Sequence, residues 1–156
     1  MMSDLEQEEQ KAETVGVRID YIPFKNMNIK GLYCNGSIAI NNRLETSIEK
    51  TCVLAEELGH HFTSSGDILN LDSVSNKKQE RAARLWAYND MITIDKLISA
   101  KESGCSNRYE IAEYLNVTES FLQESIDCYH SKYGLGFQKE EYIIFFEPFN
   151  ICRMIE

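Results

Sequence analysis

Two of the three histidines in the chain, His60 and His61, are adjacent in a segment that has a helical pattern. Apolar residues recur in that segment at spacings of three and four, namely Ile48, Cys52, Ala55, Gly59 and Phe62. Thr46 followed by Glu49 has the pattern of a capping box, which favours a helix that begins next to Thr46. Such a helix is apolar around most of its circumference and leaves one polar sector. The residues of that sector are Glu56, Glu57, His60 and His61.

The residues before this helix have the pattern of strands. Val17, Ile19 and Tyr21 alternate with other residues, and two apolar runs, 31–34 and 37–40, flank Asn35-Gly36. Asn-Gly between apolar runs is typical of a two-residue hairpin, because both central positions of a type I′ turn need a positive φ. We therefore expect a small antiparallel sheet ahead of the helix.

The residues after this helix have mainly helical patterns. One long helix is expected from about Lys77 to about Lys101, with a core-facing stripe of Ala83, Ala87, Met91, Ile94 and Ile98. Tyr109–Leu115 and Thr118–Tyr133 indicate two shorter helices joined by a tight turn. The apolar run Tyr142–Phe146 indicates a final strand or a tail that covers the core. Strands followed by helices predict an α+β fold.

The composition is that of an ordinary globular protein: 43% of the 156 residues are hydrophobic and 26% are charged. We expect residues 1–14 to be an acidic leader or a frayed helix, 15–104 to be the functional core, and 105–156 to be a C-terminal helical part and apolar tail of the same domain. Five widely spaced cysteines without a CxxC pair are expected to be reduced.

The charge balance and the lack of apolar segments restrict the partners and the location of the protein. A formal charge of −9 repels both the phosphate backbones of nucleic acids and anionic lipid surfaces. No apolar run approaches the ~20 residues that a membrane-spanning helix needs, and the first residues do not resemble a signal peptide. We therefore expect a cytoplasmic protein that binds neither nucleic acid nor membranes.

The polar sector of the first helix has a spacing that suits a metal ion. Residues four apart on a helix project side by side, so Glu56 with His60, or Glu57 with His61, can bind one ion. Spacing alone does not choose between the two pairs. The alternative is that all four side chains form a solvated helix face.

Glu80 is the candidate for a third ligand from a second helix. It lies three residues before Ala83 and therefore on the apolar stripe of the long helix, where a carboxylate needs a partner. The alternative is that Glu80 complements the helix dipole or pairs with Arg84 four residues later.

The hairpin, the segment Ala-Glu-Glu-Leu-Gly-His-His at 55–61 and the segment Glu-Arg-Ala-Ala-Arg-Leu-Trp-Ala at 80–87 resemble, in this order, the ImmA/IrrE family of metallopeptidases. The likeness is to phage and prophage members in particular and runs from about Ile22 to Tyr133. It implies a zincin-like α+β fold in which a small antiparallel sheet packs on an active-site helix and further helices. Family members carry a His-Glu-x-x-His helix, with two zinc-binding histidines and a general-base glutamate, and a glutamate ligand on the next helix.

The resemblance assigns roles to four residues of the two helices. It places Glu56 at the first metal ligand, Glu57 at the catalytic base, His60 at the second ligand and Glu80 at the third. His61 is then either a hydrogen-bonding residue that supports the ligands or the oxyanion, or a partly exposed helix residue.

The chain departs from the family motif at Glu56, which stands where the motif has histidine. A carboxylate can coordinate zinc and preserves the spacing of four residues. Two carboxylates and one neutral imidazole cancel the charge of a divalent ion, so its bound water is harder to deprotonate than with two imidazoles. Zn²⁺ is the expected cofactor, and Mn²⁺ or Fe²⁺ are alternatives.

The resemblance implies an endopeptidase that cleaves a helix-turn-helix repressor and so relieves repression in a phage or mobile element. The alternative is a non-catalytic antirepressor or protein-binding regulator with a degenerate metal site, which Glu56 leaves open. Residues 110–122 have the rhythm of a helix-turn-helix themselves, which would make the chain a DNA-binding module. A recognition helix from Thr118 would present Glu119, Glu124 and Asp127 to the phosphates, which argues against DNA binding.

Overall fold

The structure is a computed structural model that describes residues 1–26, 28–64 and 73–155, the last range with side chains from Asn76 onward. The chain divides into two compact units, Met1–Asp90 and Met91–Glu156. The motifs had placed the end of the functional core at residue 104. No helix in the described ranges is both long and apolar enough to cross a membrane.

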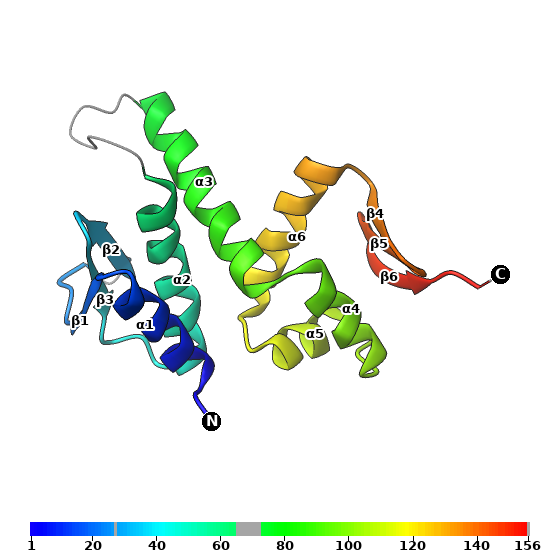
Figure 1. The fold of residues 1–156 in the computed structure, drawn as a ribbon, viewed down its shortest axis with the longest axis horizontal. Coiled ribbons are helices and arrows are strands. Elements are labelled where there is room, and N and C mark those ends of the chain that lie inside the picture. The colour runs from blue at the N-terminus through cyan, green and yellow to red at the C-terminus, as the bar shows by residue number, and fades with distance from the viewer. Residues whose placement is uncertain (27, 65–72, 156) are drawn as a thin grey trace. The chain divides into compact units, whose positions relative to one another are not determined.

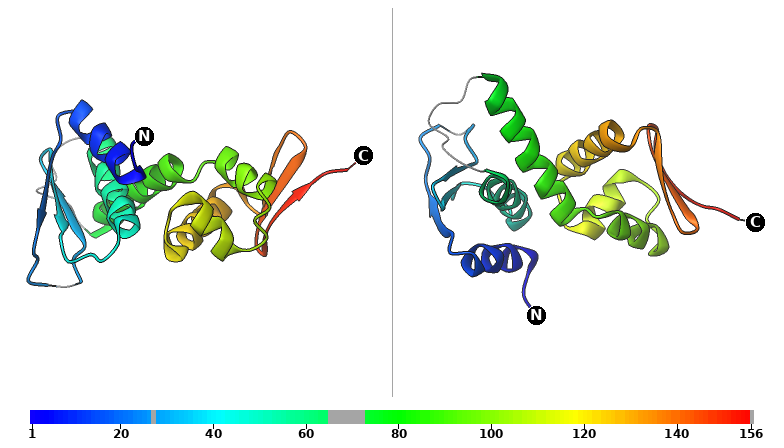
Figure 2. Two further views of the ribbon diagram at one scale, coloured as in Figure 1. Left: turned by 90° about the horizontal axis from the view of Figure 1, so that it is seen from below. Right: turned by 45° about the horizontal axis from the view of Figure 1, so that its top comes forward.

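The first unit is a three-stranded sheet with helices against one of its faces (Figure 1). Its elements are α1 (Asp4–Thr14), β1 (Arg18–Ile22), β2 (Gly31–Cys34), β3 (Ser37–Asn41), α2 (Ser47–Thr63) and α3 (Ser73–Met91). Both α1 and α2 pack on the sheet, as two further views show (Figure 2). The core between them is lined by Ala12, Val17, Ile38, Ile40, Val53, Leu54 and Leu58. Helices packed on a small sheet confirm the predicted α+β class.

The N-terminal residues, for which we expected an acidic leader or a frayed helix, form helix α1. The Ser3 hydroxyl caps it by accepting a hydrogen bond from the Glu6 N–H over 3.2 Å. Ala12 is completely buried, and Leu5 packs on the same core. The segment is rich in acidic residues, but its few apolar residues lie on one side of the helix and pack on the core.

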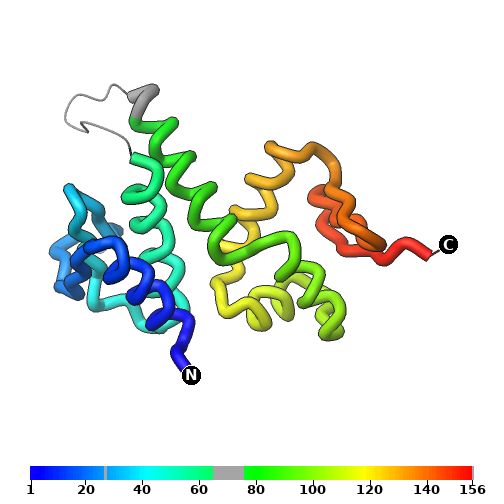
Figure 3. The backbone as a smooth tube through the Cα atoms, in the orientation of Figure 1, coloured from blue at the N-terminus to red at the C-terminus, as the bar shows by residue number. Residues whose placement is uncertain are grey.

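The hairpin at Asn35-Gly36 forms as predicted, with φ of 46° and 81° at the two central residues. It joins β2 and β3, which are antiparallel, and its path can be followed along the chain trace (Figure 3). Strand β1, however, pairs with β3 in parallel, so the sheet is mixed and has the order β1-β3-β2. Alternation of apolar residues predicts a strand but not its direction or its neighbour, which is why the parallel pair was missed.

The long helix expected from Lys77 to Lys101 is two helices. Helix α3 ends at Met91, and α4 (Ile94–Glu102) begins after Thr93, whose hydroxyl accepts a hydrogen bond from the Lys96 N–H over 3.1 Å. Thr93 has extended backbone angles and caps α4, so the helix is interrupted there. The apolar residues on either side keep a helical spacing in the sequence, which is why the pattern predicted one helix.

The second unit packs helices against a small antiparallel meander. Its elements after α4 are α5 (Arg108–Leu115), α6 (Glu119–Tyr133), β4 (Gly136–Lys139), β5 (Tyr142–Phe146) and β6 (Phe149–Arg153). The two short helices and the tight turn at Asn116, which has a φ of 55°, are as predicted. The run at 142–146 is a strand, but β4 and β6 on either side of it were not anticipated. Residues of this core include Leu97, Leu122, Ile126, Tyr129, Ile144 and Phe146.

Candidate active site

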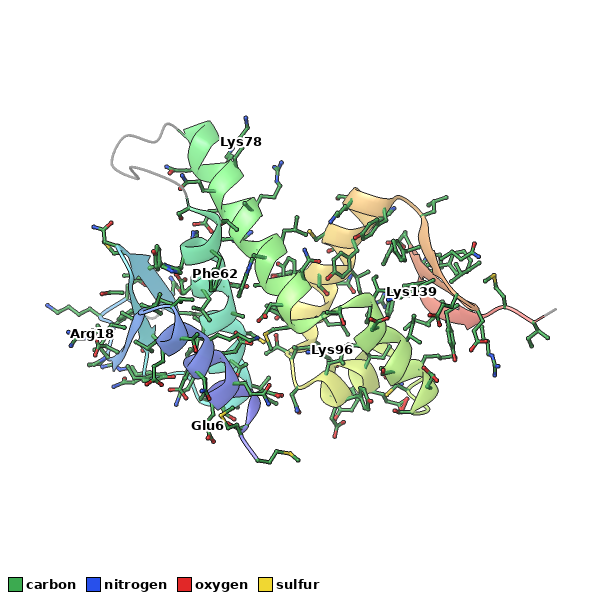
Figure 4. The ribbon with its side chains drawn as sticks, viewed as in Figure 1. Glu6, Arg18, Phe62, Lys78, Lys96 and Lys139 are labelled. Atoms are coloured by element: carbon green, nitrogen blue, oxygen red, sulfur yellow. The ribbon has the colours of Figure 1, made fainter. Side chains whose placement is uncertain are left out.

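The polar sector of α2 opens on a cavity of about 350 Å³ that also borders β2 and α3. Its walls are Gly31, Leu32, Tyr33, Glu56, Glu57, His60, Ser64, Asn76, Gln79, Glu80, Ala83 and Arg84. Phe62 on α2 and Lys78 on α3 mark this end of the two helices in the side-chain view (Figure 4). Three parts of the sequence that are distant in the chain thus meet at one hollow of the first unit.

The two helices meet backbone to backbone at Gly59. A Cβ atom at this position would lie 2.2 Å from the carbonyl oxygen of Ala83, so no residue larger than glycine fits without moving α3. The sequence pattern had placed Gly59 on the apolar stripe but gave no sign of this contact. The close approach brings His60, the next residue, alongside Glu80, which lies one turn before Ala83.

His60 and Glu80 are in contact across the two helices. The distance from His60 Nε2 to Glu80 Oε1 is 3.3 Å, and the side chains are 20% and 55% exposed, respectively. Glu80 therefore faces an imidazole of the neighbouring helix, which is the partner that a ligand role requires.

Glu57 is a largely buried carboxyl group of the cavity wall. Burial raises its pKa to about 7, and repulsion from Glu56 and then from Glu80 adds to the rise. Strand β2 passes close over it, since a Cβ atom at Gly31 would lie 3.1 Å from Glu57 Cγ. The carboxyl groups of Glu56 and Glu80 are thus near enough to Glu57 to raise its pKa.

His61 lies beside this group rather than in it. It is not among the described residues that line the cavity, and its Nδ1 atom is 2.8 Å from the hydroxyl of Tyr33. Tyr33 lines the cavity from β2, and the sequence analysis did not single it out. The hairpin signal placed Tyr33 on a strand, but the side-chain contact depends on how that strand packs on α2.

The donor set fits a divalent cation by its chemistry. Glu56, His60 and Glu80 supply two carboxylates and an imidazole, which are common ligands of Zn²⁺ and of Mn²⁺ or Fe²⁺. After burial, repulsion from Glu56 and Glu80 adds to the raised pKa of Glu57, and a bound cation would offset this repulsion. Within the described ranges, no three His, Cys, Asp or Glu side chains already stand at metal-binding distances, so binding requires side-chain rotation. Glu80, the most exposed of the three, is free to turn.

The candidate site thus consists of a close helix crossing at Gly59, a cavity lined by carboxyl and imidazole groups, and an edge strand beside it. Residues 12–127 match the family model Peptidase_M78, the IrrE N-terminal-like domain. The chain therefore belongs to this family, which confirms the predicted relationship to ImmA/IrrE proteins and indicates a metallopeptidase-like function with a metal cofactor. No curated protein matches the chain.

Proposed function

We propose that the protein is a metal-dependent endopeptidase in which Glu56, His60 and Glu80 hold the metal and Glu57 is the general base. The observation that carries the proposal is the 3.3 Å approach of His60 to Glu80 from two different helices. Glu56 is the helical neighbour of His60 at a spacing of four residues, and Glu57 is enclosed at the same cavity.

The residues of the chain supply the proton transfers of peptide hydrolysis. Zn²⁺, or alternatively Mn²⁺ or Fe²⁺, supplies Lewis acidity toward a carbonyl oxygen and a water when bound. The Glu57 carboxylate takes the proton of the attacking water and delivers it to the leaving amine. Burial raises the pKa of Glu57 to about 7 without a metal, and a bound cation beside it would lower this pKa and favour the carboxylate form that accepts the proton.

The position of β2 supports a peptide substrate. The sheet order places β2 at an edge, and its residues Gly31, Leu32 and Tyr33 line the cavity. An extended peptide can add to such an edge through backbone hydrogen bonds, which would lay its scissile bond beside Glu57.

We further propose that the substrate is a helix-turn-helix repressor and that cleavage relieves repression in the cytoplasm of a cell that carries a phage or mobile element. The support is the likeness of the two helical motifs to phage and prophage members of the family. The net charge of −9 favours a protein substrate over direct nucleic-acid binding.

The test compares the wild type with Glu57→Gln on the repressor encoded beside it, with Glu102→Gln as the matched control. The first change removes the base from the cavity, whereas Glu102 is exposed at the end of α4. We expect cleavage to fall at least about 100-fold in Glu57→Gln, because general-base catalysis contributes that much or more, and to persist in the control. Equal cleavage by both variants would contradict the assignment of Glu57.

The second candidate function is a non-catalytic antirepressor, which the carboxylate at position 56 favours. With Glu56 in place of an imidazole, two carboxylates neutralise a divalent ion and make it a weaker Lewis acid, which supports a protein that binds its partner without hydrolysing it. Derepression that persists in Glu57→Gln, with no repressor fragments on a gel, would establish this alternative.

A further inference from the structure

Tyr33 connects three elements of the first unit through its side chain. Its hydroxyl oxygen is 2.8 Å from His61 Nδ1 on α2, and the backbone N–H of Gly36 in the hairpin turn donates to the same oxygen over 3.2 Å. The edge strand, the turn and the helix therefore share one hydrogen-bonded group.

The ring of Tyr33 also borders both histidines. It is nearly parallel to the ring of His60, with 6.5 Å between centroids and 7° between planes, and it meets His61 edge to face at 5.6 Å. On another side, His60 Nε2 faces Glu80. The imidazole of His60 is thus bounded by an aromatic face and a carboxylate.

We propose that Tyr33 is a positioning residue of the site, which fixes the ring of His60 as a metal ligand and ties the edge strand to α2. Of the two directions that the 2.8 Å contact allows, the proposal is the one in which the Tyr33 hydroxyl accepts from Gly36 N–H and donates to His61 Nδ1, so that His61 carries its ring proton on Nε2. His61 in turn anchors the tyrosine ring that limits rotation of His60. This inference rests on the proposed function for the identity of His60 as a ligand.

The test uses two substitutions that separate the hydroxyl from the ring. Tyr33→Phe keeps the ring and removes the hydrogen bond to His61, and Tyr33→Leu removes both. Tyr109→Phe is the matched control, because Tyr109 is 63% exposed in the second unit. The protein is used as the full chain, and circular dichroism establishes that each variant folds.

Two measurements are made on each variant. The first is the tautomer of His61 in the metal-free protein, from long-range ¹H–¹⁵N correlation spectra of the imidazoles. The second is the affinity for Zn²⁺ by competition with a chromophoric chelator, together with the visible spectrum of the Co²⁺-substituted protein, which reports ligand geometry.

We expect Tyr33→Phe to lose the fixed tautomer of His61. Zn²⁺ binding should be weaker by about threefold in Tyr33→Phe and by about tenfold or more in Tyr33→Leu, since residues that orient ligands typically contribute 10- to 100-fold. The Co²⁺ spectrum should change in Tyr33→Leu, a result that a purely structural contact would not give. Tyr109→Phe should match the wild type.

The outcomes separate this inference from the proposed function. A wild type that binds Zn²⁺, with Tyr33→Leu equal to it in affinity and in Co²⁺ spectrum, overturns the inference alone. An unchanged His61 tautomer in Tyr33→Phe also overturns it, and this holds even where Tyr33→Leu does not fold. A wild type that binds neither metal overturns the proposed function and this inference with it.

Discussion

The carboxylate of Glu56 has two opposing effects on the site. Glu56 keeps the spacing to His60 that a ligand needs, but it also raises the pKa of the neighbouring Glu57, after burial the largest cause of the rise. A histidine at this position would be neutral and would relieve that repulsion. The residue therefore influences both the metal affinity and the ionisation of the base.

Glu56→His is predicted to strengthen metal binding. An imidazole in place of a carboxylate restores the His-Glu-x-x-His pattern and lowers the pKa of Glu57, so Zn²⁺ affinity should rise by about tenfold or more. Competition with a chromophoric chelator measures the affinity. Glu102→His is the control, because it adds the same imidazole at an exposed site on α4 and should leave the affinity unchanged. A weaker affinity in Glu56→His would show that the carboxylate is the better ligand here.

Residue spacing in the sequence predicts some of the contacts at the site and not others. The contact of His60 with Glu80 agrees with the polar sector of one helix and the apolar stripe of the next, both of which can be located from the sequence. The contacts of Tyr33 and Gly59 depend on how separate elements approach one another, and neither residue carries a sequence signal for that approach.

Among the elements of the first unit, α1 is joined to α3 by a partly buried cluster of charged side chains. Lys11 Nζ lies 2.8 Å from Glu8 Oε1 and 2.7 Å from Asp90 Oδ1, and Glu8 is 4% exposed. Of the described residues, Glu8 and Asp90 each have one buried carboxyl oxygen, Oε2 and Oδ2, that receives no hydrogen bond while both groups are ionised. Burial first, and then the hydrogen bond that a protonated Glu8 makes to Asp90, raise the pKa of Glu8 to about 7. A proton on Glu8 would satisfy both carboxyl groups.

We predict that the free energy of unfolding decreases as pH rises, because Glu8 of this cluster loses its proton. The Glu8 pKa is about 7 in the folded state against 4.5 in the unfolded state, so the folded state binds more protons between these values. The contribution of Glu8 is therefore complete below pH 4.5 and is lost as pH rises to 7, on the order of 1–3 kcal/mol in the free energy of unfolding. Urea unfolding at about pH 5 and about pH 8 measures it.

Glu8→Gln should remove this part of the pH dependence. The amide supplies a permanent donor to Asp90 and does not titrate, so the variant should be more stable than the wild type above pH 7. Glu13→Gln, exposed in the last turn of α1, is the control and should follow the wild type. A pH dependence in Glu8→Gln equal to that of the wild type would contradict the cluster's role.

The crossing of α2 and α3 gives a second prediction at this scale. Gly59→Ala must push the backbone of Ala83 away, so we expect a loss of about 1–3 kcal/mol in the free energy of unfolding and weaker Zn²⁺ binding. Urea unfolding and the chelator competition measure the two effects. Ala82→Leu, which adds more volume at an exposed position of α3, should cost little in either measurement. Full metal affinity in Gly59→Ala would mean that the site tolerates a wider crossing.

The sequence predicted the α+β class of the fold, but not the pairing of all strands or the ends of all helices. Most helices follow from apolar spacing and capping residues, and the hairpin follows from Asn35-Gly36. The parallel pairing of β1, the interruption at Thr93 and the strands β4 and β6 were missed. Strand order and helix breaks depend on tertiary packing, which local pattern does not encode.

Metal is predicted to stabilise the first unit and to act through His60. Because a ligand of the folded state stabilises by mass action, Zn²⁺ at 100 times its dissociation constant should add about 2.7 kcal/mol to the free energy of unfolding. The melting temperature should rise with Zn²⁺ in the wild type and in His130→Ala, but not in His60→Ala, since His130 belongs to α6 of the second unit. If the two units melt separately, the increase should be confined to one transition.

The direct contact of main chains at Gly59 and Ala83 bears on which ions can be accommodated. This contact fixes how closely the two helix backbones approach beside His60 and Glu80. If those two residues share a cation, the distance between their ligand atoms can adjust only through the side chains, chiefly through the exposed Glu80 carboxylate. Tolerance of ions with different radii would then depend on how far that one side chain can turn, because the backbones cannot move closer together.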